Sequence, residues 1–170
     1  MSEQLEFVLR TILIGVGATA VMDIWAIFLY RFFRVESLDY KLLGRWLGHL
    51  PNGHFVHQSI VQAKPIQSEH ILGWCAHYLI GITFSALLLS IWGLEWARSP
   101  SLFPALFIGV VTIIAPFFML QPGMGAGIAA SKTPKPNVAR LKSLGTHSAY
   151  GFGLYIAALL TSLLIPIGKP

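Results

Sequence analysis

Residues 7–33 read FVLRTILIGVGATAVMDIWAIFLYRFF, an almost unbroken apolar run. A helix of about 20 mostly apolar residues is long enough to cross the hydrocarbon core of a bilayer. Residues 70–92, 102–121 and 144–165 are also long enough and have the same apolar character. Only 11% of the chain is charged, and a soluble core of this size cannot bury so much apolar surface. The sequence therefore predicts an all-α integral membrane protein, with residues 1–170 forming a single domain built as a four-helix bundle.

The basic residues are distributed unevenly between the two sides of the predicted bundle. Two long loops hold nine of the twelve, which are Arg31, Arg34, Lys41, Arg45, Lys64, Lys132, Lys135, Arg140 and Lys142. The opposite side holds Arg10, Arg98 and Lys169. Cytoplasmic loops of membrane proteins are enriched in Lys and Arg, so we expect the long loops in the cytoplasm and both termini outside. The basic loops are then expected to contact membrane lipids, and no nucleic-acid partner is expected.

The first loop contains a predicted amphipathic helix. An apolar stripe recurs every four residues, at Leu38, Leu42, Trp46 and Leu50. Charged and polar side chains lie off this stripe, at Asp39, Lys41, Arg45 and His49. Ser37 is the predicted N-cap. A helix of this kind is suited to lying at the membrane surface, and we expect it at the inner leaflet.

Titratable side chains inside the apolar spans indicate a candidate site. Burying such a group in a bilayer costs a few kcal/mol or more, so its presence needs a reason. Asp23 and His77 share helical faces with small residues, which mark the sides where helices meet. The main candidates, all at similar depth on the cytoplasmic side, are Asp23, His77, His147 and Gln121. Weaker candidates at the margin are His70 and Met124.

The convergence of Asp23, His77 and His147 would permit more than one chemistry. Two histidines and a carboxylate match the ligands of a divalent metal ion. The same groups could relay protons, because histidine changes charge near neutral pH. Haem between the two histidines is a weaker hypothesis, since four helices show no clear room for the ring. The alternative is a structural network in which Asp23 accepts hydrogen bonds and holds the helices in register.

A glycine-rich segment follows the third span. Its candidate anion-binding residues are Gly123, Gly125, Gly127, Ser131, Lys132 and Thr133. Alternating glycines allow backbone N–H groups to turn toward an anion. The spacing is not that of a Walker motif. The alternative is a tight turn followed by a basic segment, and a bound lipid phosphate is compatible with both interpretations.

Two stretches of the chain resemble a known family. One is residues 121–134, QPGMGAGIAASKTP, followed by His147 and by residues 151–155, GFGLY; the other is residues 69–78, EHILGWCAHY. Over nearly its whole length the chain resembles a family of small bacterial inner-membrane proteins of unknown function. The resemblance implies a four-span protein of the bacterial inner membrane, whose outer side is the periplasm. It implies no activity, substrate or site residue.

Three functions remain open at this point. The protein could bind a metal ion or relay protons at the Asp/His cluster, and a transporter would need a homo-oligomer because four helices leave little room for a pathway. It could be a lipid-modifying enzyme, although Ser131 and Ser148 have no evident activating group. It could also be a structural or accessory subunit without a ligand.

The topology can be tested with reporter fusions. A reporter that is active only in the periplasm, fused after Lys169, is expected to be active, because the long loops carry most of the positive charge. A reporter active only in the cytoplasm is expected to be inactive at the same position. The opposite pair of results would reverse the assigned orientation.

Overall fold

The computed structural model describes residues 2–165, and this part of the chain is helical with connecting loops. The long apolar helices are α1 (Glu3–Phe33), α3 (Glu69–Arg98), the interrupted helix Leu102–Gly123 and α6 (Pro136–Leu164). Each is long and apolar enough to cross a membrane, so the expected all-α fold with four spans is confirmed. A shorter helix, α2 (Tyr40–His49), lies in the first loop.

The third and fourth spans differ in detail from the prediction. Helix α4 (Leu102–Val111) ends early, and a π-helix (Pro116–Leu120) leads into the short α5 (Gln121–Gly123). Proline removes a backbone donor and disfavours regular helix, which accounts for the irregularity near Pro116. Helix α6 begins eight residues before the predicted start at 144, because Pro136 is favourable in the first turn of a helix.

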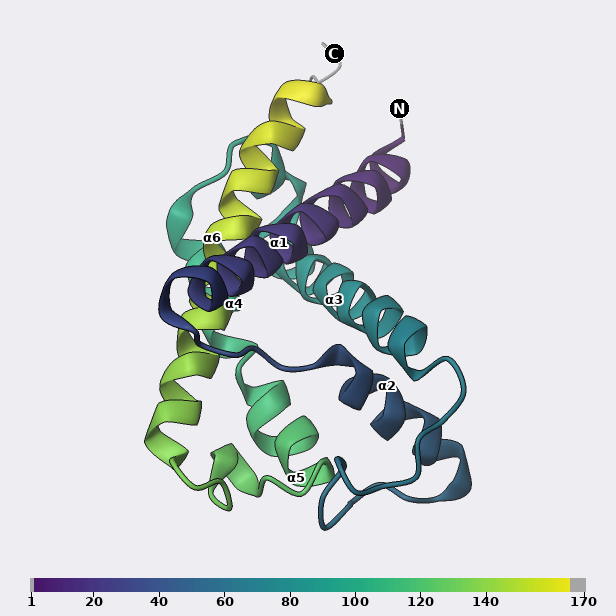
Figure 1. Cartoon of the computed structure of the whole chain (residues 1–170). Coiled ribbons are helices and arrows are strands. Elements are labelled where there is room, and N and C mark those ends of the chain that lie inside the picture. The colour runs from purple at the N-terminus through teal and green to yellow at the C-terminus, as the bar shows by residue number, and fades with distance from the viewer. Residues whose placement is uncertain (1, 166–170) are drawn as a thin grey trace.

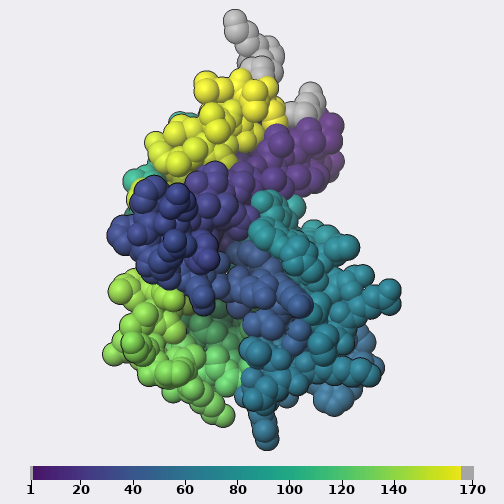
Figure 2. Space-filling view, viewed as in Figure 1, coloured from purple at the N-terminus to yellow at the C-terminus, as the bar shows by residue number. Residues whose placement is uncertain are grey.

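The helices assemble with α1 packed between α3 and α6, while α4 packs on the other side of α6. Figure 1 shows α1 beginning and α6 ending at the same end of the molecule, which we call the terminal end. At the opposite end lie α2, α5 and the two long loops, and we call this the loop end. In the space-filling view the two loops lie side by side at this end (Figure 2).

The outer surface of the bundle is apolar. Ile24, Phe32, Phe103 and Leu163 are 65%, 69%, 72% and 79% exposed, respectively. A soluble monomer rarely leaves so many large apolar side chains in water. Together with the four long apolar helices, this surface indicates a multi-pass membrane protein.

Helix α2 is docked against α3. Its N-cap is Asp39, whose carboxylate accepts the N–H of Lys41 at 2.9 Å, so the prediction of Ser37 as N-cap was wrong. Arg45 was expected on the polar face, but it is buried against α3, where it binds both carboxylate oxygens of Glu69 at 2.8 and 2.9 Å. This face of α2 can point inward because the Arg45 guanidinium pairs with the Glu69 carboxylate.

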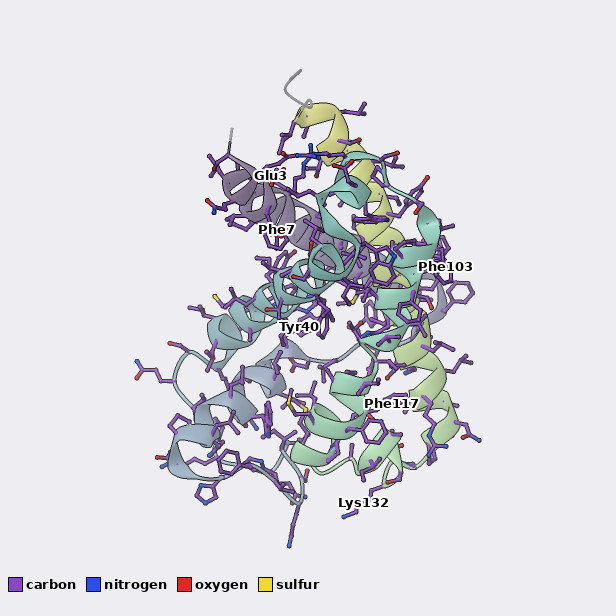
Figure 3. The ribbon with its side chains drawn as sticks, turned by 180° about the vertical axis from the view of Figure 1, so that it is seen from behind. Glu3, Phe7, Tyr40, Phe103, Phe117 and Lys132 are labelled. Atoms are coloured by element: carbon purple, nitrogen blue, oxygen red, sulfur yellow. The ribbon has the colours of Figure 1, made fainter. Side chains whose placement is uncertain are left out.

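The backbones of α2 and α3 come into direct contact at two glycines. A Cβ at Gly44 would collide with the carbonyl oxygen of Glu69, and a Cβ at Gly73 would collide with that of Tyr40. Small residues allow this approach, which larger residues would prevent. The contact fixes Tyr40, the first residue of α2, against the middle of the molecule (Figure 3).

A second buried ion network joins the helices at the terminal end. Arg10 is fully buried, and its guanidinium donates to Glu6 at 2.8 Å and to the carbonyl oxygens of Ala97 and Ile165 at 3.1 and 2.8 Å. Arg98 binds both carboxylate oxygens of Glu6, at 3.0 and 2.7 Å. These contacts connect α1 with the ends of α3 and α6.

Replacement of Gly73 tests the close contact between α2 and α3. Gly73→Ala is expected to lower the free energy of unfolding by about 1–3 kcal/mol, the usual cost of overpacking, because its methyl group meets the α2 backbone. Gly145→Ala is the matched control, since that position on α6 is open and alanine favours helix. Thermal unfolding of both purified variants measures the difference. Equal stability of the two would contradict the contact.

Candidate functional site

Asp23 of α1 and His77 of α3 lie in direct contact inside the bundle. Nε2 of His77 is 2.9 Å from Oδ1 of Asp23. The hydroxyl of Tyr78, the next residue on α3, donates to Oδ2 of Asp23 at 3.0 Å. Each carboxylate oxygen of Asp23 therefore has a donor from α3, and this part of the predicted site is brought together by the fold.

Tyr40 of α2 covers the imidazole of His77. The two rings are stacked, with centroids 3.9 Å apart and planes 21° apart, and the Tyr40 hydroxyl lies 3.5 Å from Oδ1 of Asp23. Burial raises the pKa of the Tyr40 phenol well above its usual range, and the Asp23 carboxylate adds to the shift. The phenol consequently stays protonated and serves as a donor. Trp74 contacts the same imidazole edge-on, with a centroid distance of 5.8 Å.

The site lies within the apolar part of the helices. Asp23 is ten residues before the end of α1, and His77 is eight residues after the start of α3. At 1.5 Å per residue these positions are about 15 and 12 Å along the helix axes from those two helix ends. The side chain of His77 is only 7% exposed and that of Asp23 is 15% exposed. The polar pair is thus supplied by α1 and α3 and covered by Tyr40 of α2.

His147 belongs to a different contact, between α6 and α4. Its Nδ1 lies 3.1 Å from Oγ1 of Thr112 and 3.3 Å from the carbonyl oxygen of Gly109. Thr112 gives its own proton to Gly109, so Nδ1 of His147 is the donor here. Within residues 2–165 no three His, Cys, Asp or Glu side chains are placed to hold a metal ion. The predicted convergence of Asp23, His77 and His147 on a metal is therefore not found.

The remaining candidates for this cluster lie elsewhere. The Gln121 amide donates to Ser143 of α6 at 3.4 Å, and its buried Oε1 has no partner within the described part of the chain. His70 is exposed and accepts the indole N–H of Trp74 at 3.2 Å. Met124 is buried in the apolar contact between α2 and the loop end. None of the three has a hydrogen bond to Asp23 or His77 among residues 2–165.

The glycine-rich segment packs against the first loop. The N–H of His57 donates to the carbonyl of Gly123 at 2.9 Å, and that of Ile60 donates to the carbonyl of Met124 at 3.0 Å. A cleft of about 350 Å³ opens beside this contact, and its lining residues are Val56, His57, Pro122, Gly125, Gly127, Ile128, Ser131 and Lys132. Four of the six predicted anion-binding residues line the cleft, whereas Gly123 and Thr133 do not.

Comparison with known proteins identifies the family. Residues 12–161 match the model of a family described as "Protein of unknown function (DUF2938)". The chain belongs to this family. No curated protein and no solved structure matches it. The family carries no activity to transfer, so any function must be argued from the geometry of the chain itself.

Sequence reasoning missed the two tyrosines of the site. Tyr78 stands next to His77 and could equally belong to the aromatic belt at the membrane surface. The signal for Tyr78 was its position one residue from a buried histidine, within reach of the same partner. Tyr40 offered only its place directly after the N-cap Asp39, because its contact with His77 depends on how α2 docks.

Removing the carboxylate tests the geometry of the pair. Asp23→Ala leaves His77 and Tyr78 without their acceptor and is expected to lower the free energy of unfolding by about 1–3 kcal/mol. Asp23→Asn retains an acceptor oxygen and is expected to cost less. Thermal unfolding in lipid nanodiscs compares the two variants. Identical losses would show that the hydrogen bonds do not hold the site.

Proposed function

We propose that this membrane protein binds and releases a proton at the Asp23–His77 pair. The 2.9 Å contact between Nε2 of His77 and Oδ1 of Asp23 carries the proposal, because both side chains are largely buried within apolar helices. Ionisable groups inside membrane spans are rare and commonly belong to ion or proton pathways. Histidine suits this role because its charge changes near neutral pH.

The hydrogen bonds define how the pair can accept a proton. An ionised Asp23 only accepts, so Nε2 of neutral His77 must carry the hydrogen that it shares with Oδ1. Nδ1 of the imidazole is then free to take up a proton, which changes the charge of the pair from −1 to 0. The hydroxyls of Tyr78 and Tyr40 remain donors to the carboxylate in both states.

The donor set favours a proton over a metal ion. One carboxylate and one imidazole are two good ligands, and the neighbouring groups are phenols that already donate to Asp23. Protein zinc sites use at least three His, Cys, Asp or Glu ligands. The third ligand of the original hypothesis, His147, is engaged with Thr112 and Gly109.

Protonation of the pair bears on how three helices pack. Asp23 belongs to α1, His77 to α3, and Tyr40 stacks on His77 from α2. A protonated His77 would attract Asp23 more strongly, and the ring on which Tyr40 stacks would then carry a positive charge. We place the loop end in the bacterial cytoplasm, on the charge distribution of the loops, so protons would exchange with that side. A pathway across the membrane would require a homo-oligomer, since residues 2–165 of one chain supply only four candidate spans.

Infrared difference spectroscopy across a pH change tests this proposal on protein in nanodiscs. The wild-type protein is expected to show carboxylate and imidazole difference bands when the pH is changed, because proton uptake by His77 alters both members of the hydrogen-bonded pair. Asp23→Asn is expected to remove the carboxylate band, and His77→Gln the imidazole band, because each removes one member of the pair.

His147→Gln is the matched control, because this histidine is also part-buried within a span but is bonded to Thr112 and Gly109 instead of a carboxylate. It is expected to leave the bands of the Asp23–His77 pair unchanged. Difference spectra that are the same in wild type, Asp23→Asn and His77→Gln would overturn the proposal.

A further inference from the structure

The cleft at the loop end has unused backbone donors. Gly127 and Ile128 both line it, and their N–H groups have no acceptor among residues 2–165. The surrounding N–H groups of Gly125, Ala130 and Lys132 all donate to nearby backbone carbonyls, either in α5 or in the loop itself. Consecutive free N–H groups in a concave loop form a partial positive charge that suits an anion.

The backbone beside these donors is held in an unfavourable conformation. Ala129 and Ala130 have positive φ values of 47° and 60°, in the left-handed region that non-glycine residues rarely adopt. Nε of Arg140 on α6 donates to the carbonyl oxygen of Ala129 at 2.9 Å and holds the loop there. Gly127, with φ 76°, has no room for a Cβ beside Ser131 and Lys132, so these two residues lie directly against it.

The charge around the cleft is positive and is not compensated locally. No Asp or Glu follows Glu95 in the sequence. Within the described residues, no carboxylate pairs with the basic side chains of this region, which are Lys132, Lys135, Arg140 and Lys142. Lys132 lines the cleft and lies at the loop end (Figure 3).

We propose that this cleft binds the phosphate group of an anionic phospholipid. Gly127 and Ile128 supply the backbone donors, while Ser131 and Lys132 supply a hydroxyl and a charge. The edge of the cleft is apolar, since Val56 is 72% exposed and Ile128 is 57% exposed. An apolar edge beside a cationic cleft matches the glycerol and acyl part of a lipid better than a free anion. This site is separate from the Asp23–His77 pair, and neither proposal depends on the other.

Lipid binding to the purified full-length protein tests the site. Native mass spectrometry in a neutral detergent compares phosphatidylglycerol, phosphatidylcholine and soluble glycerol phosphate as probes. Phosphatidylglycerol is expected to bind most tightly. Lys132→Gln is expected to weaken its binding about tenfold, because a charge-assisted hydrogen bond to phosphate is lost. Lys132 is exposed, so this substitution leaves the folded core intact.

Lys135→Gln is the matched control. It removes the same charge from the same loop, but Lys135 does not line this cleft. Binding that is unchanged by Lys135→Gln and weakened by Lys132→Gln supports the site. Equal weakening by both variants would show diffuse attraction to the basic loop and would overturn it. Glycerol phosphate that binds as tightly as phosphatidylglycerol, with the same dependence on Lys132, would assign the cleft to a soluble phosphate compound and overturn the lipid proposal.

Discussion

The close approach of helices at glycine is the constraint on which the rest of the structure depends. In a membrane, helices gain little from burying apolar side chains that lipid would cover equally well, so association relies on packing and on bonds between helices. Where α2 meets α3, Gly44 and Gly73 bring backbone against backbone. That contact places Tyr40 on the ring of His77. A wider separation would leave His77 and Asp23 open to lipid on this side.

Helical periodicity was enough to predict the contact between Asp23 and His77, but not the rest of the site. Asp23 and His77 lie on faces marked by small residues, and those faces do meet, at 2.9 Å. His147 also lies on an inward face. A face argument tells which side of a helix points into the bundle, but not which neighbour stands opposite. Helix α6 packs against both α1 and α4. His147 is on the side toward α4, where its Nδ1 lies within hydrogen-bond distance of Thr112 and Gly109.

The buried ion pairs could not be predicted from the sequence for a related reason. Arg45 looked like part of a polar face because helix periodicity treats every charge as solvent-facing. Its partner, Glu69, is 24 residues away and meets it only after α2 folds back on α3. At the terminal end, Glu6 and Arg10 have the spacing of a helical ion pair, but Arg98 joins them from 92 residues away. Hydropathy could predict the number and approximate extent of the spans, because these depend on local composition and not on contacts between distant residues.

The two ends of the bundle use buried charge differently. At the terminal end, Glu6 lies between two guanidinium groups, and arginine stays charged under all ordinary conditions. That network is fixed in charge and therefore suited to holding α1, α3 and α6 together. Toward the loop end, the corresponding acid is Asp23 and its partner is a histidine, which can change charge. Both acids lie on α1 and both have partners on α3, so the proposed protonation of His77 would act on helices that are anchored at their far ends. Protonation of His77 would then alter the packing of α1 and α3 near Asp23, while the permanently charged network around Glu6 keeps the same helices together at the terminal end.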